Sequence, residues 1–97
     1  MRVHITNDAG ADLRQIGEYI GRDSLPQAEE FLSKLRSFIF TLGDYPLAYR
    51  LRPEWGSSVR AANFGNYLVI FEVQDSVVLV LRVASGRRNI AALLSET

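Results

Sequence analysis

The hydrophobic period of this chain changes from helical to alternating near Gly43, and that change constrains the fold more than any other feature. From residue 8 to Leu42 the apolar residues recur at helical spacing, and after Gly43 they alternate with polar residues over short segments. Helices followed by a run of strands predict an α+β fold, in which the helices pack on an antiparallel sheet. With 97 residues the chain has enough apolar area for one core, so we expect a single domain over residues 1–97.

The N-terminal half predicts one strand and two helices. Residues 2–6 alternate apolar and polar side chains, as a half-buried strand does, and residues 8–20 carry apolar side chains at helical spacing. Ser24 and Gln27 match a capping box, which opens a second helix whose apolar stripe continues to Leu42. Because only a few residues separate the two helices, we expect an antiparallel helical hairpin.

The C-terminal half predicts three strands. Residues 58–64, 67–73 and 77–84 are rich in apolar and β-branched side chains and are separated by turn-forming residues, which favours a three-stranded antiparallel meander. Residues 45–57 contain two prolines and a glycine, so they form a loop or a short edge segment. The tail over residues 87–97 is either a short helix or a frayed terminus.

The faces of the meander depend on the length of its two hairpin loops. If each loop holds three residues, Asn63 faces Tyr67 and Val73 faces Val77, and one face is apolar throughout. The residues predicted to face the helices are then Tyr67, Val69, Phe71, Val73, Val77, Leu79, Leu81 and Val83. The opposite, open face would carry two arginines beside Leu68, Ile70, Val78 and Val80.

Arginine is the dominant basic residue, since it accounts for ten of the eleven basic side chains. Its planar fork suits paired contacts with carboxylates or phosphates. In the register above, Arg60 and Arg82 share the open face, and Arg87 and Arg88 follow directly after that strand. With Arg50 and Arg52 of the preceding loop, they predict a positive patch. The alternative is a solvated surface on which the arginines pair with Glu54, Glu72, Asp75 or acidic helix residues.

Composition argues against several functions. The chain has no cysteine, and its one histidine, His4, lies on the first predicted strand, where a structural role is the simpler interpretation, so we expect no metal site and no cofactor. It has no leader sequence and no apolar run near ~18 residues, which favours a cytoplasmic protein. The net charge of zero does not favour direct sequence-specific binding of nucleic acid.

The order of these elements, together with several short motifs, resembles the RelE/ParE superfamily of bacterial toxins, and its ParE branch in particular. The resemblance extends from about Val3 to Arg88. The motifs that carry it are ADLRQIGEYI (11–20), LGDYP (42–46), Val59-Arg60, GNYLVIFEV (65–73) and VLVLRVASGRR (78–88).

The resemblance implies a toxin of a type II toxin–antitoxin system, with one of two activities. RelE-like members cleave messenger RNA on the ribosome, whereas ParE-like members inhibit DNA gyrase. RNA cleavage requires an acid and a base beside cations, and the segment after Arg88 has neither tyrosine nor histidine. We therefore favour a non-catalytic gyrase inhibitor; the alternatives are a ribosome-dependent mRNA endonuclease and an inactive module that only binds its antitoxin. The residues predicted to contact the target are Arg60, Arg82, Arg87, Arg88 and Trp55, although Trp55 could instead be a packed loop residue.

The resemblance also implies a partner, an antitoxin of the ParD type with a flexible acidic segment that folds across the toxin. A stable heteromer would be the cellular form. The predicted receiving surfaces are the outer face of the helical hairpin and the apolar residues of the open sheet face, namely Leu68, Ile70, Val78 and Val80.

Overall fold

A computed structural model describes residues 1–96 and confirms the predicted α+β order of elements. The elements are β1 (Arg2–Ile5), α1 (Asn7–Gly21), α2 (Leu25–Thr41), a short 3-10 helix η1 (Pro46–Ala48), β2 (Arg60–Phe64), β3 (Tyr67–Gln74), β4 (Val77–Ser85) and α3 (Ile90–Ser95). The four strands form one sheet in the order β1-β4-β3-β2. Strand β1 pairs with β4 in parallel, and the other neighbours pair antiparallel as the predicted meander.

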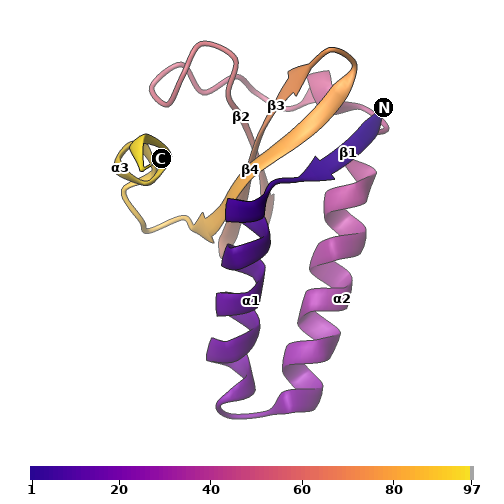
Figure 1. Cartoon of the computed structure of the whole chain (residues 1–97), viewed down its shortest axis with the longest axis vertical. Helices are drawn as coiled ribbons and strands as arrows, with labels where there is room; N and C mark the ends of the chain where they lie inside the picture. Colours follow the sequence, from indigo (N-terminus) through magenta and orange to yellow (C-terminus); the bar gives the residue numbers. More distant parts are fainter. Residues whose placement is uncertain (97) are drawn as a thin grey trace.

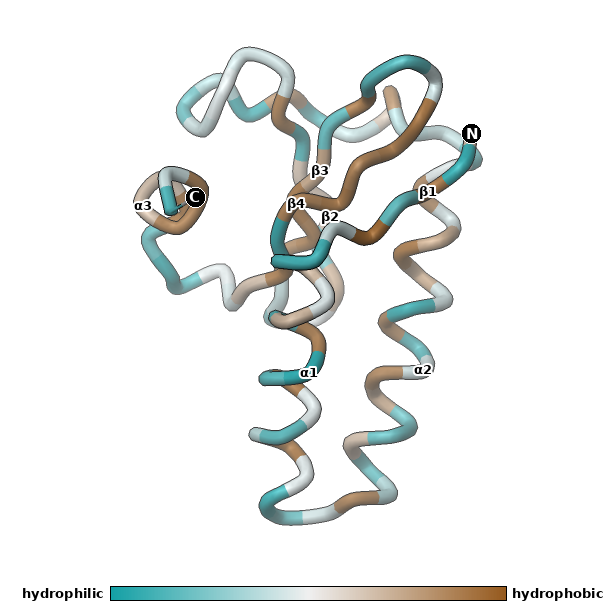
Figure 2. Tube along the Cα trace, in the orientation of Figure 1, coloured by the Kyte–Doolittle hydropathy of each residue, from teal (hydrophilic) through white to brown (hydrophobic). Residues whose placement is uncertain are grey.

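The sheet separates two apolar clusters. Helices α1 and α2 lie side by side as an antiparallel pair (Figure 1), and their apolar stripes pack on the sheet around Leu13, Leu35 and Phe71. Helix α3 packs on the opposite face, where Ile90 and Leu93 cover a smaller cluster. Figure 2 shows hydrophobic positions recurring along both long helices and concentrated in β4 and α3. Of the two alternatives for the tail, the helical one is confirmed.

Each long helix begins at a hydroxyl residue that accepts a backbone hydrogen bond. The Ser24 hydroxyl accepts from the amide of Gln27 at 3.3 Å, so the predicted cap of α2 is confirmed. The Thr6 hydroxyl caps α1 by accepting from the amide of Ala9 at 3.2 Å, and it also donates to the carbonyl oxygen of Val80 at 2.8 Å. Thr6 therefore holds the start of α1 against β4.

This difference between the two caps predicts different costs of removal. Thr6→Ala loses a cap and a part-buried bond to the sheet, so we expect the free energy of unfolding to fall by about 2 kcal/mol. Ser24→Ala loses an exposed cap alone, and we expect a fall of about 1 kcal/mol. Urea denaturation of both variants measures the two values, and equal losses would show that the bond from Thr6 to β4 contributes nothing.

The predicted three-residue hairpin loops are wrong, because both loops hold two residues. Phe64 faces Tyr67 across Gly65-Asn66, and Gln74 faces Val77 across Asp75-Ser76. Asp75 and Ser76 both have positive φ, at 51° and 61°, as a tight turn that follows the twist of the sheet requires.

A β-bulge then shifts the register once more. Ile70 faces Arg82 while Phe71 faces Val80, which leaves Leu81 without an opposite residue. The two-residue turn thus places Val78 and Val80, which precede the bulge, in the core under the helices, and the bulge returns Val83 to the same face. The predicted placement of Val77, Leu79 and Leu81 on that face is therefore wrong. Among residues 1–96, no helix combines the length and apolarity needed to cross a membrane.

Candidate functional site

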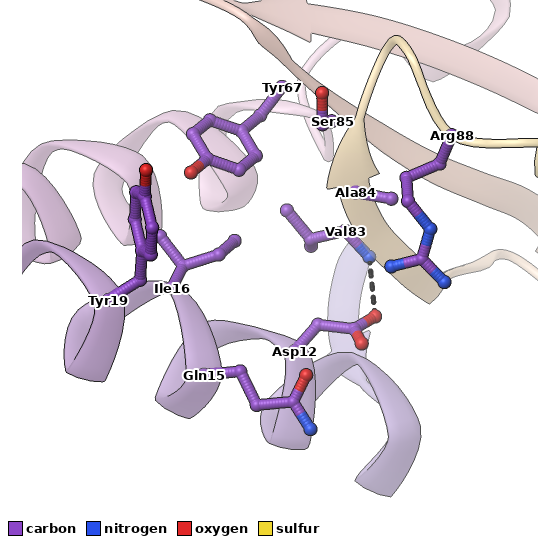
Figure 3. A pocket seen from close by; sticks show the side chains of 9 residues that line it. All are labelled: Asp12, Gln15, Ile16, Tyr19, Tyr67, Val83, Ala84, Ser85 and Arg88. Atoms are coloured by element: carbon purple, nitrogen blue, oxygen red, sulfur yellow. Dashed lines mark hydrogen bonds between the residues drawn. The ribbon is translucent and has the colours of Figure 1, made fainter.

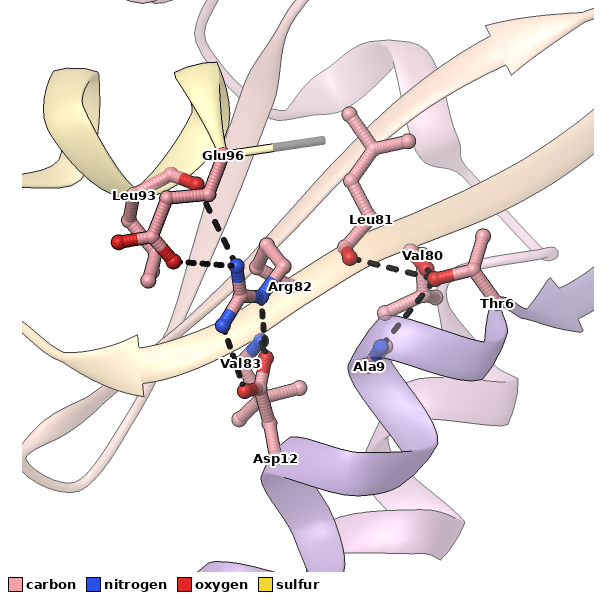
Figure 4. A network of polar contacts seen from close by, with 9 residues as sticks. All are labelled: Thr6, Ala9, Asp12, Val80, Leu81, Arg82, Val83, Leu93 and Glu96. Carbon is pink, nitrogen blue, oxygen red and sulfur yellow. Dashed lines mark hydrogen bonds and ion pairs between the residues drawn. The ribbon is translucent and has the colours of Figure 1, made fainter.

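Arg82 forms a paired contact with a buried carboxylate of α1 (Figure 4). Its Nε lies 2.8 Å from Oδ2 of Asp12, and its Nη2 lies 2.9 Å from Oδ1. Asp12 Oδ2 also accepts a hydrogen bond from the backbone amide of Val83 at 2.9 Å. Asp12 is only 8% exposed, so a carboxylate that would be costly to bury alone is satisfied by three donors and ties α1 to β4.

Arg82 also holds the C-terminal helix. Its Nη1 donates to the carbonyl oxygen of Leu93 at 3.3 Å and lies 3.8 Å from a carboxylate oxygen of Glu96. The hydrogen bonds to Asp12 raise the pKa of Arg82 and outweigh the opposing effect of partial burial, so the guanidinium stays charged. The prediction that Arg82 stands on an open face is wrong, because Asp12 and α3 enclose its side chain.

Arg60 lies on the other side of the sheet. It faces Phe71 in the register, and its Nη1 donates to the carbonyl oxygen of Tyr49 at 2.6 Å. Arg82 faces Ile70, and neighbouring residues of one strand point to opposite faces. The prediction that Arg60 and Arg82 share a face is therefore wrong.

Trp55 is half-buried in the loop that precedes β2, where it packs against the cluster under α3. The Arg52 guanidinium lies 3.8 Å from the centre of its ring, and Arg52 Nε lies 2.9 Å from Oε2 of Glu54. A backbone hydrogen bond and then the Arg52 side chain lower the pKa of Glu54. Trp55 thus fits the packed-loop alternative, and Arg52 fits the alternative in which arginines pair with acidic residues.

Arg87 and Arg88 form an exposed turn between β4 and α3, which we call the basic turn. Their backbone is fixed, because the amide of Arg87 donates to the Ser85 hydroxyl at 3.3 Å and that of Arg88 donates to the Ser85 carbonyl oxygen at 3.0 Å. Neither guanidinium has a hydrogen bond or an ion pair with any residue of 1–96. These two arginines emerge at the end of β4 as predicted, with their charges free to meet a partner.

The apolar residues predicted for an open sheet face are covered. Val78 and Val80 are fully buried under the helical hairpin, and Ile70 is fully buried under α3, with Leu68 half-buried beside it. The shifted register explains the first two, and α3 explains the others. Their predicted placement on an accessible surface is wrong.

The outer face of the helical hairpin, by contrast, is accessible. A groove of about 650 Å³ runs between α1 and α2, and Leu25 at its edge is 69% exposed. Its apolar floor and charged rim are formed by Gly17, Gly21, Leu25, Ala28 and Leu32 with Arg14, Glu18, Arg22 and Glu29. We name it the hairpin groove.

Sequence reasoning missed Asp12, and the sequence contained a signal for it. Asp12 lies three residues after Ala9 and next to Leu13, on the apolar side of α1. A carboxylate there, together with an arginine inside an apolar strand, indicates a buried pair. Residues 1–96 contain no cluster of three or more histidine, aspartate or glutamate residues able to hold a metal ion.

A helical hairpin on one face of an open meander, with a parallel N-terminal strand and a basic turn after the last strand, defines the class of RelE/ParE-like toxins. The family profile described as the ParE toxin of the type II toxin-antitoxin system, parDE, matches residues 3–90. The chain therefore belongs to this family, and the predicted membership is confirmed.

Two solved structures show the same fold. The chromosomal ParDE toxin–antitoxin system from P. aeruginosa has a chain with 20% sequence identity and a TM-score of 0.77, covering 88% of this chain and 95% of that one. The toxin–antitoxin complex RelBE2 from Mycobacterium tuberculosis has a chain with 26% identity and a TM-score of 0.64, covering 87% and 95% respectively. No curated protein sequence matches the chain significantly.

Proposed function

We propose that this ParE toxin inhibits DNA gyrase by binding it, without catalysing a reaction itself. The observation that carries the proposal is the separation of Arg60 from Arg82. These are the cations that RNA cleavage would need at one place, yet they lie on opposite faces of the sheet and bind Tyr49 and Asp12.

The chemistry of RNA cleavage supports the same conclusion. Attack of a 2′-hydroxyl on the neighbouring phosphate needs a base, an acid and cations that stabilise the charged transition state. The segment after Arg88 has no tyrosine and no histidine, and the Arg82 guanidinium already has three protein acceptors. Target contact therefore falls to Arg87 and Arg88, whereas Trp55 packs against the cluster under α3.

We further propose an antitoxin of the ParD type as the partner that neutralises the toxin. Both solved relatives are parts of toxin–antitoxin pairs. The hairpin groove has the apolar floor and charged rim that suit the apolar face of a helix. Binding there would leave the basic turn to the extended part of the antitoxin, where acidic side chains could screen Arg87 and Arg88.

The double variant Arg87→Ala/Arg88→Ala tests the target contact. We expect its concentration for half-inhibition of gyrase supercoiling to rise about tenfold or more, because two free charges at an interface are removed. Arg36→Ala is the matched control, since Arg36 is an exposed arginine on α2 away from the basic turn. Supercoiling and trapped DNA cleavage are measured beside RNA cleavage on translating ribosomes.

The same assays separate the alternatives. Gyrase inhibition with intact RNA supports the proposal. Intact supercoiling with cut RNA would refute it and favour a RelE-like endonuclease. The fold is also similar to that of a chain of the RelBE2 complex. No effect in either assay, from a chain that binds its antitoxin, would identify an inactive binding module.

A further inference from the structure

A cleft lies beside the basic turn, between α1 and the end of β4 (Figure 3). It has a volume of about 170 Å³ and adjoins a second hollow of about 500 Å³ that shares part of its lining. Tyr19, Tyr67 and Ser85 line both hollows, while Arg88 lines the first and Arg87 the second. Neither Tyr19 nor Tyr67 takes part in the hydrogen bonds of Arg82 and Asp12.

The two tyrosines place aromatic rings and free hydroxyl groups at this cleft. Tyr67 faces Ser85 across β3 and β4, and its ring is held by packing against Phe31 at 5.7 Å between centroids. Tyr19 is 66% exposed on α1; the Arg22 guanidinium lies 6.0 Å from the centre of its ring, and the rest of the side chain is accessible to a ligand. Neither phenol hydroxyl forms a hydrogen bond within residues 1–96.

The charged side chains at the cleft that have no partner among the described residues are positive. Its one acidic lining residue is Asp12, and both oxygens of that carboxylate are occupied by Arg82 and by the amide of Val83. Arg87 and Arg88 have no such partner among the described residues. Figure 3 shows the Arg88 side chain directed along the cleft wall toward Val83 and Asp12. An anionic group in the cleft would therefore meet unpaired guanidinium groups.

We propose that this cleft binds a nucleotide unit of single-stranded DNA, with the base against Tyr19 and the phosphate at Arg87 and Arg88. Aromatic side chains stack with any base, and arginine offers paired donors to phosphate oxygens. Ser85 lines both parts of the cleft, so its hydroxyl can donate a hydrogen bond to a sugar or phosphate oxygen. The inference deepens the proposed function, on which the choice of DNA rests, because a cleaved-DNA complex of gyrase presents strand ends to an inhibitor bound beside the break.

Fluorescence anisotropy of the purified chain with a short fluorescein-labelled oligothymidylate tests the site. We expect Tyr19→Ala to weaken binding about tenfold through loss of stacking. Arg88→Ala should weaken it about fivefold at low salt and make the slope of log K against log salt shallower by about 0.7, as expected for one lost phosphate contact. The matched controls are Tyr45→Ala and Arg36→Ala, which remove an exposed tyrosine and an exposed arginine elsewhere and should leave the affinity unchanged.

Three results would overturn the proposal: no saturable binding at low salt, equal losses in the site variants and their controls, or tighter binding of oligouridylate than of oligothymidylate. Efficient competition by free thymidine monophosphate would overturn the assignment to a DNA strand in favour of a free nucleotide. The result of the gyrase assay does not depend on the result of the oligonucleotide assay. Oligonucleotide binding without gyrase inhibition would refute the proposed function, and inhibition without oligonucleotide binding would refute this site.

Discussion

Replacing Arg82 by alanine is expected to lower the free energy of unfolding by about 4 kcal/mol, because it leaves a buried carboxylate without its cation. Asp12 is 8% exposed and would keep only the backbone amide of Val83 as a donor. For a domain of this size each kcal/mol lowers the Tm by about 4–8 °C, so the melting temperature should fall by roughly 20 °C. Urea denaturation and thermal melts measure both quantities.

Three further variants, Arg82→Lys, Asp12→Ala and the double variant of both residues, measure how much of this loss belongs to the ion pair. Arg82→Lys keeps the charge but loses the fork that holds both Asp12 oxygens at 2.8 and 2.9 Å, so we expect an intermediate loss. Asp12→Ala/Arg82→Ala should lose clearly less than the sum of the two single variants, because the residues are coupled. A loss of about 1 kcal/mol or less in Arg82→Ala would instead mean that the pair behaves as an exposed ion pair.

This expectation changes how an inactive Arg82 variant should be interpreted. The Arg82 guanidinium also holds the carbonyl oxygen of Leu93, so its loss loosens α3 over Ile70. Toxicity lost in such a variant would follow from lost structure as readily as from a lost target contact. Arg87 and Arg88 carry no comparable structural bonds through their side chains, which makes them the informative positions.

The helices could be predicted because their signals are local. The apolar stripe of α2 and the Ser24 cap lie within a few residues of each other, and the structure places both as the sequence indicates. The strands of the meander were also located correctly, since alternation and turn residues bound each of them. What failed was the assignment of faces, which depends on pairing between segments.

Two features of the sheet decided those faces, and neither has a clear signal in the sequence. Gly65-Asn66 and Asp75-Ser76 are compatible with loops of two or three residues, and the difference of one residue moves side chains to the other face. The bulge beside Ile70 and Phe71 then reverses the faces within β4. The sheet face that was predicted to be open is covered by α3. The composition of the tail does not specify where α3 packs, because that packing joins segments far apart in the sequence.

The observed register and the register predicted from the sequence give opposite expectations for lysine substitutions at two neighbouring residues of β4. Val80 is fully buried in the core under the helices, so Val80→Lys places an unpaired ammonium group there at a cost of several kcal/mol. That cost is comparable with the whole stability of a small domain, about 5–15 kcal/mol, and we expect the variant to be largely unfolded. Far-UV circular dichroism and the dispersion of its amide NMR signals measure this.

Leu79→Lys is the matched control one residue away. Leu79 is half-buried and faces Glu72 across the sheet, so the new ammonium group meets a carboxylate, and we expect a loss of about 1 kcal/mol with a native spectrum. Three-residue hairpin loops would have placed Leu79 in the core and Val80 outside it, which predicts the opposite order. A folded Val80→Lys beside an unfolded Leu79→Lys would therefore contradict the two-residue turn at Asp75-Ser76, on which the faces of both residues depend.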